Sequence, residues 1–324
     1  MKLNPFYKEN KKQLFSLIKS IYNTETNENF WNWRIFNEKF GQAIQFGMWD
    51  DEILVGYHVL HPIPMKIKNN VEKVLFSMAT MTHPDYRGQG IFQKLTKTTY
   101  EKATDLGYKF VIGFPNKNSQ KTFFEKLNWI NLGTINEYYT ETFDFPSNTT
   151  TNFKISHLQK FDNRINEIWN FNKYNYDFIV ERSMDYLNWR FIETPKIKFQ
   201  NYPISKYFCF LLESKNPETY FVIKKYGTEN AHIVDIFGKL NEEIILEILK
   251  HSFEFCKREK ISYLSLWPDC NLNNQNLFSV LHKCKFKKKS SETFRGICLF
   301  DNSIKKLIGK KPNWFYTMSD SDTY

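Results

Sequence analysis

Cysteine is scarce in this sequence, and long apolar runs, low-complexity segments and long charge runs are absent. The cysteines all lie in the second half and include no Cys-x-x-Cys pair: Cys209, Cys256, Cys270, Cys284 and Cys298. This pattern gives no indication of a zinc site or a disulfide framework, so we expect buried thiols and no bound metal. No apolar run approaches the length of a membrane helix, and Met1–Pro5 lacks the apolar core of a signal peptide. We therefore expect a cytoplasmic protein that does not insert into membranes.

The length and the charge balance narrow the class of protein further. At 324 residues the chain is long enough for two domains, and 45 basic against 35 acidic side chains leave a net charge of +10. Such a surplus suits nucleic acid, an anionic membrane surface or anionic small molecules. The densest basic group, Lys283–Lys289, alternates with Cys284 and Phe286 and is typical of a solvated face. A polyanionic cosubstrate and a phosphorylated substrate would explain the balance, so we expect no nucleic-acid partner.

Residues 81–92 are the most informative segment of the chain. An apolar strand (74–81) leads through a tight turn at His83–Tyr86 into a loop with Gly88 and Gly90, and a helix begins at Ile91. Glycine lets a ligand approach the backbone closely, and the free N–H groups of a helix's first turn attract an anion. Arg87 adds a positive charge at the mouth. We interpret this loop as a cradle for a pyrophosphate, although a glycine pair between a strand and a helix is more often an ordinary turn.

The downstream order is a strand (110–114), a polar turn (115–119) and a short helix ending at Trp129. Together with the Thr82-His83-Pro84 turn and the Arg87–Phe92 loop, this order resembles the GNAT (Gcn5-related) N-acetyltransferase family. The resemblance implies an acetyl-CoA cosubstrate and an N-acetyltransferase activity. It also implies these acetyl-CoA contacts: Thr80, Met81, Thr82, Arg87, Gly88, Gln89, Gly90, Ile91, Phe92, Gln93, Asn116, Asn118 and Phe124.

Three residues depart from the family pattern. Phe92 stands at a position for small residues, and Asn128 replaces a glycine whose left-handed conformation asparagine tolerates. Phe124 stands where many members carry a tyrosine that protonates the leaving thiolate, and a phenyl ring cannot donate a proton. The loss is tolerable because a thiol pKa of about 8.5 makes the thiolate an adequate leaving group.

The chain contains its own pattern twice. Phe30–Ile35 (FWNWRI) reappears as Tyr186–Phe191 (YLNWRF), at an offset of 156 residues between Trp33 and Trp189. Phe114-Pro115 returns as Trp267-Pro268, and the segment 123–129 has a counterpart at 277–286. Three markers in the same order and at nearly constant separation indicate a duplication, although aromatic-rich segments can also resemble one another by chance.

The second copy lacks the cradle, because Asn241-Glu242-Glu243 opens its helix without a glycine pair or an arginine. We therefore expect an α/β (α+β) fold of two tandem GNAT-like domains, each a mixed, mainly antiparallel sheet flanked by helices. The catalytic domain would span residues 1–145 and a degenerate domain residues 146–324, with a polar linker at 146–151. The strand 134–145 would close the first sheet.

The general base is the least determined part of the site. His58, His61 and His83 are more typical of packed or outward side chains. Glu137 on the closing strand is one candidate, and the C-terminal tail offers Asp320 and Asp322 after an aromatic segment at 314–316. Disordered segments are poor in aromatic residues, so we expect the tail to pack back toward the acceptor amine. A backbone N–H near Met81 or Thr82 would stabilise the oxyanion.

The acceptor is open at this level. Tandem chains of this type resemble enzymes of bacterial surface-polysaccharide synthesis, which implies an amino sugar, free or nucleotide-linked, as the small-molecule partner. A peptide or protein amine and an aminoglycoside are the alternatives within the enzyme class. A non-catalytic CoA-binding module and an assembly partner are the alternatives outside it. A closed basic pocket would favour a sugar nucleotide, an acidic groove an aminoglycoside and an open groove a peptide. A homodimer is compatible with the sequence.

Overall fold

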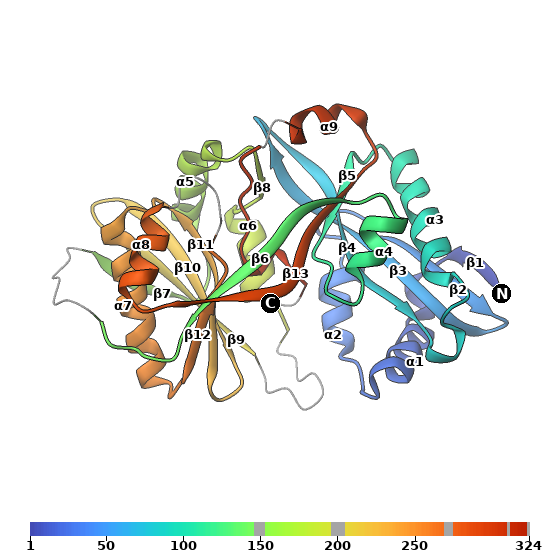
Figure 1. The fold of residues 1–324 in the computed structure, drawn as a ribbon, viewed down its shortest axis with the longest axis horizontal. Helices are drawn as coiled ribbons and strands as arrows, with labels where there is room; N and C mark the ends of the chain where they lie inside the picture. Colours follow the sequence, from blue (N-terminus) through green and yellow to red (C-terminus); the bar gives the residue numbers. More distant parts are fainter. Residues whose placement is uncertain (146–152, 196–204, 269–274, 310–311, 323–324) are drawn as a thin grey trace.

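The computed structural model describes residues 1–145, 153–195, 205–268, 275–309 and 312–322. Two lobes lie side by side and are joined by two long strands that cross between them (Figure 1). The first half of the chain forms β1 (Lys2–Pro5), η1 (Lys8–Asn10), α1 (Lys11–Tyr22), α2 (Glu28–Trp31), η2 (Asn32–Phe36), β2 (Ile44–Asp50), β3 (Ile53–Ile67), β4 (Asn70–Thr82), η3 (Pro84–Tyr86), α3 (Ile91–Asp105), β5 (Phe110–Gly113), α4 (Gln120–Lys126) and β6 (Ile130–Thr140).

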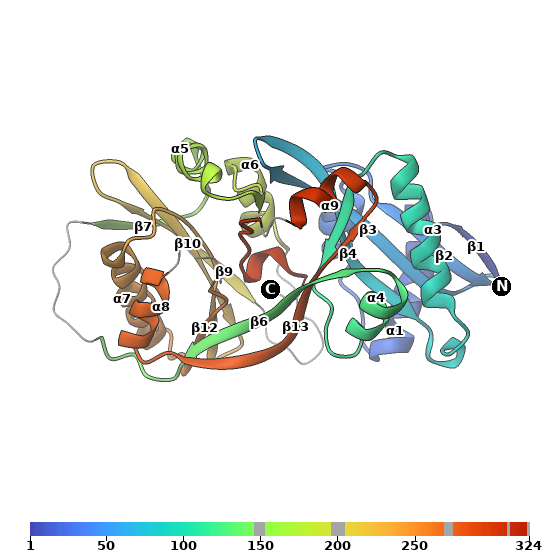
Figure 2. The same ribbon diagram turned by 45° about the horizontal axis from the view of Figure 1, so that its top comes forward.

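The second half repeats this order and adds a C-terminal segment. Its elements are β7 (Lys154–Leu158), α5 (Asn163–Asn172), η4 (Lys173–Asn175), β8 (Phe178–Val180), α6 (Met184–Leu187), η5 (Asn188–Ile192), β9 (Lys206–Glu213), β10 (Pro217–Tyr226), β11 (Asn230–Gly238), α7 (Glu242–Arg258), β12 (Tyr263–Leu266), α8 (Gln275–Lys283), β13 (Lys287–Leu299), α9 (Asn302–Ile308) and η7 (Met318–Asp320). In each lobe a long helix, α3 or α7, packs beside the sheet (Figure 2).

One sheet runs through both lobes. Equivalent strands of the two repeats lie at matching distances from its two ends. The order is β1-β2-β3-β4-β5-β13-β6-β12-β11-β10-β9-β7, with β8 added beside β3. Strands β4 and β5 pair parallel in the first lobe, as β11 and β12 do in the second, and most other pairs are antiparallel. The mixed, mainly antiparallel sheet with flanking helices and the tandem arrangement are therefore confirmed.

The closing strands of the two repeats are exchanged. We expected the strand at 134–145 to close the first sheet, and this was wrong. Strand β13 lies between β5 and β6, pairing Ile297 with Ile112, while the far end of β6 pairs with β12. The boundary at residues 145/146 stays a prediction, and strands from its two sides pair with each other. The predicted linker at 146–151 lies outside the described residues.

The repeated Asn-Trp-Arg motifs meet where the lobes touch. Each motif follows a short helix and forms one π-helical turn, η2 or η5. The indole N–H of Trp33 donates to the carbonyl of Trp189 at 2.9 Å, and the indole of Trp189 donates to the carbonyl of Trp33 at 3.4 Å. The two rings stack with centroids 5.0 Å apart. Reciprocal contacts between equivalent residues indicate an approximate two-fold relation between the repeats, as a duplication predicts.

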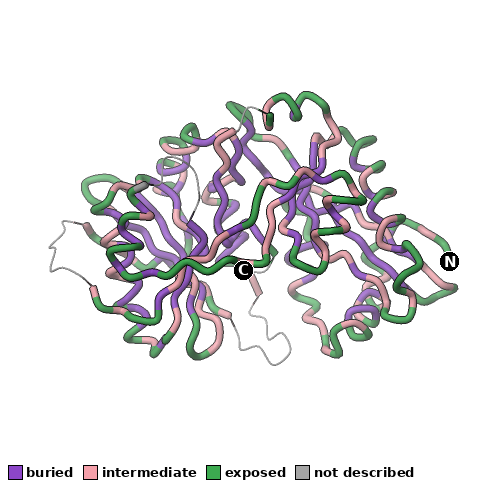
Figure 3. Tube along the Cα trace, in the orientation of Figure 1, coloured by how far each residue is buried: buried purple, intermediate pink, exposed green. Residues whose placement is uncertain are grey.

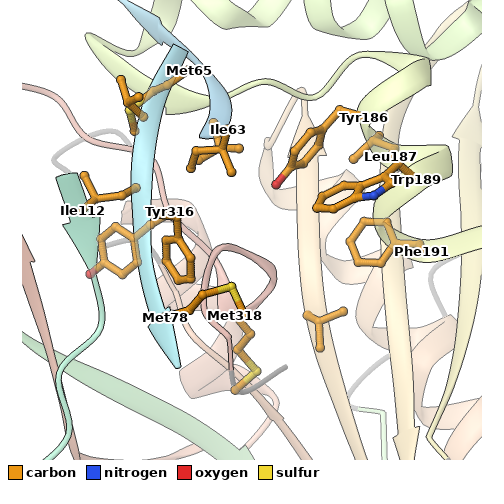
Figure 4. Close-up of a cluster of buried hydrophobic side chains, with 14 of the residues drawn as sticks. Ile63, Met65, Met78, Ile112, Tyr186, Leu187, Trp189, Phe191, Tyr316 and Met318 are labelled. Atoms are coloured by element: carbon orange, nitrogen blue, oxygen red, sulfur yellow. The ribbon is translucent and has the colours of Figure 1, made fainter. Parts of the chain in front are cut away.

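One apolar core spans both lobes and includes the C-terminal tail. In Figure 4, Ile63, Met65 and Ile112 of the first lobe lie on one side of the cluster and Trp189 of the second lobe on the other, and Tyr316 and Met318 of the tail belong to the same cluster. Phe315, Tyr316 and Met318 are buried, so the tail does pack back as expected. Both lobes contain buried residues, whereas the crossing strands β6 and β13 are mostly intermediate or exposed (Figure 3). Among the described residues, no helix combines the length and the apolar character that crossing a membrane requires.

Candidate active site

The glycine loop has the geometry of an anion cradle. Gly88 and Gly90 adopt φ of +78° and +73°, and Gly90 is the residue from which α3 starts. Left-handed backbone of this kind favours glycine. A Cβ built on either glycine would meet no atom within 4 Å, so the space over the loop is open. Among the described residues, none accepts a hydrogen bond from the N–H groups of residues 88–93.

A row of free N–H groups at a helix start, with the positive end of the helix dipole behind it, attracts a phosphate. Arg87, exposed at the end of the preceding turn, adds a full charge. The second repeat differs at the equivalent place. There the Asn241 side chain already accepts from the N–H of Ile244 at 2.9 Å, and two glutamates follow it. The two helix starts therefore differ, and the anion-binding role of the first stays a prediction.

Strand β4 separates from β5 before the glycine loop but stays paired with β3 as far as Thr82. It pairs with β5 only at Leu75 and Phe76. Further along, Ala79 adopts φ of +48°, and the register against β3 shifts where Val59 faces Met78 but Tyr57 faces Met81. The extra residue is a β-bulge, which bends the strand and leaves backbone groups unpaired. Predicted contact residues Thr80, Met81 and Thr82 all lie on this bulged end.

A cavity of about 470 Å³ opens beside the bulge. That volume is ordinary for a small-molecule site. Its walls come from both repeats and from the tail: Met78, Ala79 and Met81 of β4, Tyr22, Asn27, Trp31, Trp33 and Arg34 of the first repeat, Arg190, Tyr207, Lys224 and Tyr226 of the second, and Ser321 and Asp322 of the tail. The cavity therefore adjoins the bulged end of β4, and the glycine loop follows that end of the strand along the chain.

A second hollow of about 710 Å³ lies beside α3 and α4. It begins at Gln93 of the cradle and is lined by three lysines, Lys97, Lys126 and Lys305. A basic hollow next to a phosphate cradle suits the nucleotide portion of a polyanionic ligand.

The tail candidates occupy two different environments. Asp320 is buried and accepts from Arg182 at 2.7 Å and from the Thr317 N–H at 2.8 Å. Arg182 also approaches Asp235 at 3.4 Å, so a buried ion cluster fixes the tail. Asp322 lies further on, at the cavity wall, with its side chain exposed to that space. Surrounding protein nevertheless displaces enough water to raise the pKa of Asp322, and Arg34 works in the opposite direction.

The other predicted residues lie outside the cavity as far as the described residues define it. Glu137 accepts from the Tyr263 hydroxyl at 3.0 Å and pairs in register with Lys289. The Asn116 carboxamide oxygen accepts hydrogen bonds from the N–H groups of Asn118 and Ser119, at 3.0 and 3.1 Å. Phe124 packs edge-on against Phe294 with ring centroids 6.1 Å apart, and so holds α4 on β13.

The histidines and cysteines behave as packed side chains. His58 and His61 are buried, and burial lowers the pKa of His58 to about 3. His61 stacks on Trp189, and its pKa also falls because it is buried and faces Arg34. The described cysteines are buried free thiols (Cys209, Cys256, Cys284 and Cys298), and Cys270 lies outside the described residues. In the described part of the chain, no cluster of three His, Cys, Asp or Glu side chains could hold a metal.

Comparison with known proteins agrees with this geometry. Residues 3–130 match the family model of the acetyltransferase (GNAT) domain. A search of curated protein sequences gave no match. A probable N-acyltransferase from Enterococcus faecalis V583, a conserved protein of unknown function, superposes with a TM-score of 0.71 at 14% identity, covering 93% of this chain and 72% of that one.

Two further structures have the same architecture. A tandem GNAT protein from the clavulanic acid biosynthesis pathway has a TM-score of 0.62 at 9% identity, covering 92% of this chain and 98% of that chain. N-myristoyltransferase from Saccharomyces cerevisiae, with myristoyl-CoA bound, has a TM-score of 0.60 at 11% identity, covering 93% and 78%. The first repeat is thus a GNAT acetyltransferase domain, in a chain with the tandem GNAT fold. The matched GNAT acetyltransferase domain supports an acyltransferase, as predicted.

Sequence reasoning missed most of the cavity wall. Arg34 and Arg190 stand inside the repeated Asn-Trp-Arg motif that revealed the duplication, so a signal for them existed. Tyr207 and Lys224 lie on β9 and β10 with no local motif. Arg182, which holds the tail, gave no signal, because its partners Asp235 and Asp320 are distant in sequence.

Proposed function

We propose that this protein transfers an acetyl group from acetyl-CoA to a primary amine of a small acceptor bound in the cavity between the lobes. The observation that carries the proposal is the cavity's position. It opens onto the bulge of β4, directly before the cradle of residues 87–93 on the same strand and loop. A donor held at the cradle and an acceptor held in the cavity would meet at the bulge, and such alignment supplies much of the rate enhancement.

The donor would be held largely by backbone groups. The N–H groups of residues 88–93 suit a diphosphate, Arg87 adds charge, and the lysine-lined hollow beside α3 suits the nucleotide end. The bulge at Ala79 leaves backbone near Met81 free to face the thioester carbonyl. One such N–H directed at the developing oxyanion is typically worth a factor of ~100 or more in rate.

Asp322 is the carboxylate best placed to act as the general base. Its side chain reaches the cavity, whereas Asp320 is engaged by Arg182 and Glu137 by Tyr263. The amine nitrogen would attack the thioester carbon as Asp322 accepts its proton, and the C–S bond would break to give an amide and a thiolate. That thiolate needs little acid assistance because its conjugate thiol has a pKa of about 8.5. Phe124 accordingly need not supply a proton.

The walls favour an amino sugar, free or nucleotide-linked, as the acceptor. Trp31, Trp33, Tyr207 and Tyr226 offer flat surfaces for a sugar ring or a base. Cationic side chains outnumber acids in the cavity, which disfavours a polycationic aminoglycoside. A peptide amine would need a continuous groove for its backbone, and side chains from both repeats and the tail close around this space instead.

The test is a thiol-release assay with acetyl-CoA and a panel of amino sugars, amino-sugar nucleotides, peptides and aminoglycosides. We expect thiol release with one or more amino sugars and a loss of most turnover in Asp322→Asn. Release with peptides alone would overturn the acceptor assignment. No release with any amine, together with retained acetyl-CoA binding, would favour the rival proposal of a non-catalytic CoA-binding module.

A further inference from the structure

Three buried cations converge on the cavity. Arg34, Arg190 and Lys224 all contribute to its wall, although only 6%, 3% and 7% of their surfaces are exposed. Asp322 is the one acid among the described residues that line it. Burying a cation is costly, and burying several together is more so, because each loses hydration and repels the others. An anion bound beside Arg34 would offset part of that cost.

The two arginines are equivalent residues of the repeats. Each occupies the third position of Asn-Trp-Arg in a π-helical turn, and the reciprocal hydrogen bonds of Trp33 and Trp189 place the two turns against each other. The duplication thus brings two guanidinium groups to one space between the lobes. Irregular π-helical turns are frequent at functional sites.

Arg34 lacks the partners that a buried arginine normally has. Among the described residues, no group accepts a hydrogen bond from it, and no carboxylate lies within ion-pair distance. Its guanidinium carbon lies 5.2 Å from the ring centre of Trp189 and 5.6 Å from that of Trp33. Burial, and then the neighbouring Arg190, lower the pKa of Arg34 to about 10, so it remains charged at neutral pH.

The other two cations extend the positive field. Arg190 donates to the Tyr207 hydroxyl and to the Ser319 carbonyl, each at 3.1 Å, which fixes its guanidinium group. Lys224 lies 5.7 Å from the ring of Tyr207. Burial raises the pKa of Tyr207, but Arg190 and Lys224 outweigh it and the net shift is downward. The electrostatic potential at the Tyr207 hydroxyl is therefore positive.

We infer that Arg34, Arg190 and Lys224 form an anion-recognition site that binds a phosphate or carboxylate group of the ligand in this cavity. Naming that ligand the acetyl acceptor rests on the proposed function, whereas the anion site itself does not. A planar guanidinium stacked on aromatic rings keeps its N–H edge free for bidentate bonds to an oxyanion. Attraction is strong here because little water screens these charges.

The test measures binding without turnover, using matched neutral and charged ligands. Glucosamine is compared with glucosamine 6-phosphate, UDP-glucosamine and muramic acid by calorimetry, at 50 and 300 mM salt. We expect the wild-type protein to bind at least one charged ligand about tenfold or more tightly than glucosamine, and less tightly at high salt. Phosphate and carboxylate ligands distinguish the two kinds of anion.

Substitutions then locate the site. Arg34→Gln and Lys224→Gln should each remove most of the preference for the charged ligand, and Arg34→Lys should restore part of it. Lys225→Gln is the matched control, because Lys225 is the next residue on β10 but pairs with Glu259 at 3.0 Å and should leave the preference intact. A ligand held by the cradle instead would respond to Gly90→Asp and not to Arg34→Gln.

Failure of this inference differs from failure of the proposed function. Equal binding of neutral and charged ligands, binding of none of them, or an equal loss in Lys225→Gln would overturn the anion site, whatever the thiol-release assay gives. Charge-selective binding that depends on Arg34, with no thiol release from any amine, would retain the anion site and overturn acetyl transfer.

Discussion

Two glycines with the same backbone conformation lie at opposite ends of α3, and only the first belongs to the predicted cradle. Gly90 precedes the first turn with φ of +73°, and Gly107 follows the last turn with φ of +78°. A Cβ on either would meet nothing within 4 Å. The same substitution at both positions therefore separates the electrostatic role of the cradle from the cost of left-handed backbone.

We predict that Gly90→Asp lowers acetyl-CoA affinity at least tenfold, because its carboxylate would face the diphosphate. Gly107→Asp should strain the backbone similarly, by about 1 kcal/mol, and leave that affinity unchanged. Titration calorimetry with acetyl-CoA measures the affinities, and thermal unfolding measures the strain. Equal affinities in the two variants would show that the diphosphate binds elsewhere.

Asp322 predicts a particular dependence of activity on pH. Surrounding protein displaces water from this carboxyl and raises its pKa, although Arg34 opposes the shift. A general base must be deprotonated, so kcat/KM should fall as the pH drops through this raised pKa. Asp322→Asn should lose that acidic limb and ~100-fold or more in turnover, with acetyl-CoA affinity unchanged. Asp105→Asn, an exposed change on α3, is the control. An unchanged pH profile in Asp322→Asn would assign the base elsewhere.

Among the elements, the C-terminal tail is held by an ion cluster within the core. Arg182 donates to the carbonyl of Val180 at 2.8 Å and to Asp320 at 2.7 Å, and Thr317 bridges to Asp235 at 2.8 Å. Deleting residues 313–324 would remove Phe315, Tyr316 and Met318 from the core together with Asp322. Single substitutions therefore distinguish the catalytic from the structural role of the tail better than a truncation does.

We predict that Arg182→Gln destabilises the protein by about 3–5 kcal/mol, because it leaves the carboxylates of Asp235 and Asp320 buried without their cation. Arg164→Gln should cost only about 0–1 kcal/mol, since its pairs with Asp162 and Glu213 lie at the surface. Urea unfolding followed by circular dichroism gives both values. Similar free energies of unfolding for the two variants would contradict a structural role for the buried cluster.

At the scale of the whole molecule, the exchanged strands make the lobes interdependent. Strand β13 supplies the neighbour of β5, and β6 extends to β12 in the other lobe. Without β13, the first lobe would expose the backbone edge of β5 and part of the shared core, which favours aggregation.

We therefore predict that the complete protein unfolds in one cooperative transition, and that residues 1–145 expressed alone do not form a stable domain. Residues 1–145 and 146–324 expressed together should associate into a complex that binds acetyl-CoA. Urea unfolding and size-exclusion chromatography provide the measurements. A sharp unfolding transition for residues 1–145 alone would show that the first repeat is self-sufficient.

Much of the fold follows from local patterns. The glycine loop, the helix that starts at Ile91 and the strand that follows it were readable, because side-chain spacing and turn residues act over a few positions. The exposed lysines at 283–289 flank buried Cys284 and Phe286, as their alternation indicated. The roles of the cradle residues, Asp320, Asp322 and Glu137 remain predictions.

By itself, the sequence determined that two copies of one pattern exist, that the first carries a glycine loop at the start of a helix and that the tail belongs to the packed structure. Tertiary structure alone decided that β13 lies between β5 and β6. It also decided that Asp320 binds Arg182 while Asp322 lines the cavity, and that Arg34 and Arg190 line the same cavity. The reason is physical. Helix starts and turns depend on neighbouring residues, whereas pairing between strands and the convergence of buried charges depend on contacts between residues more than a hundred positions apart.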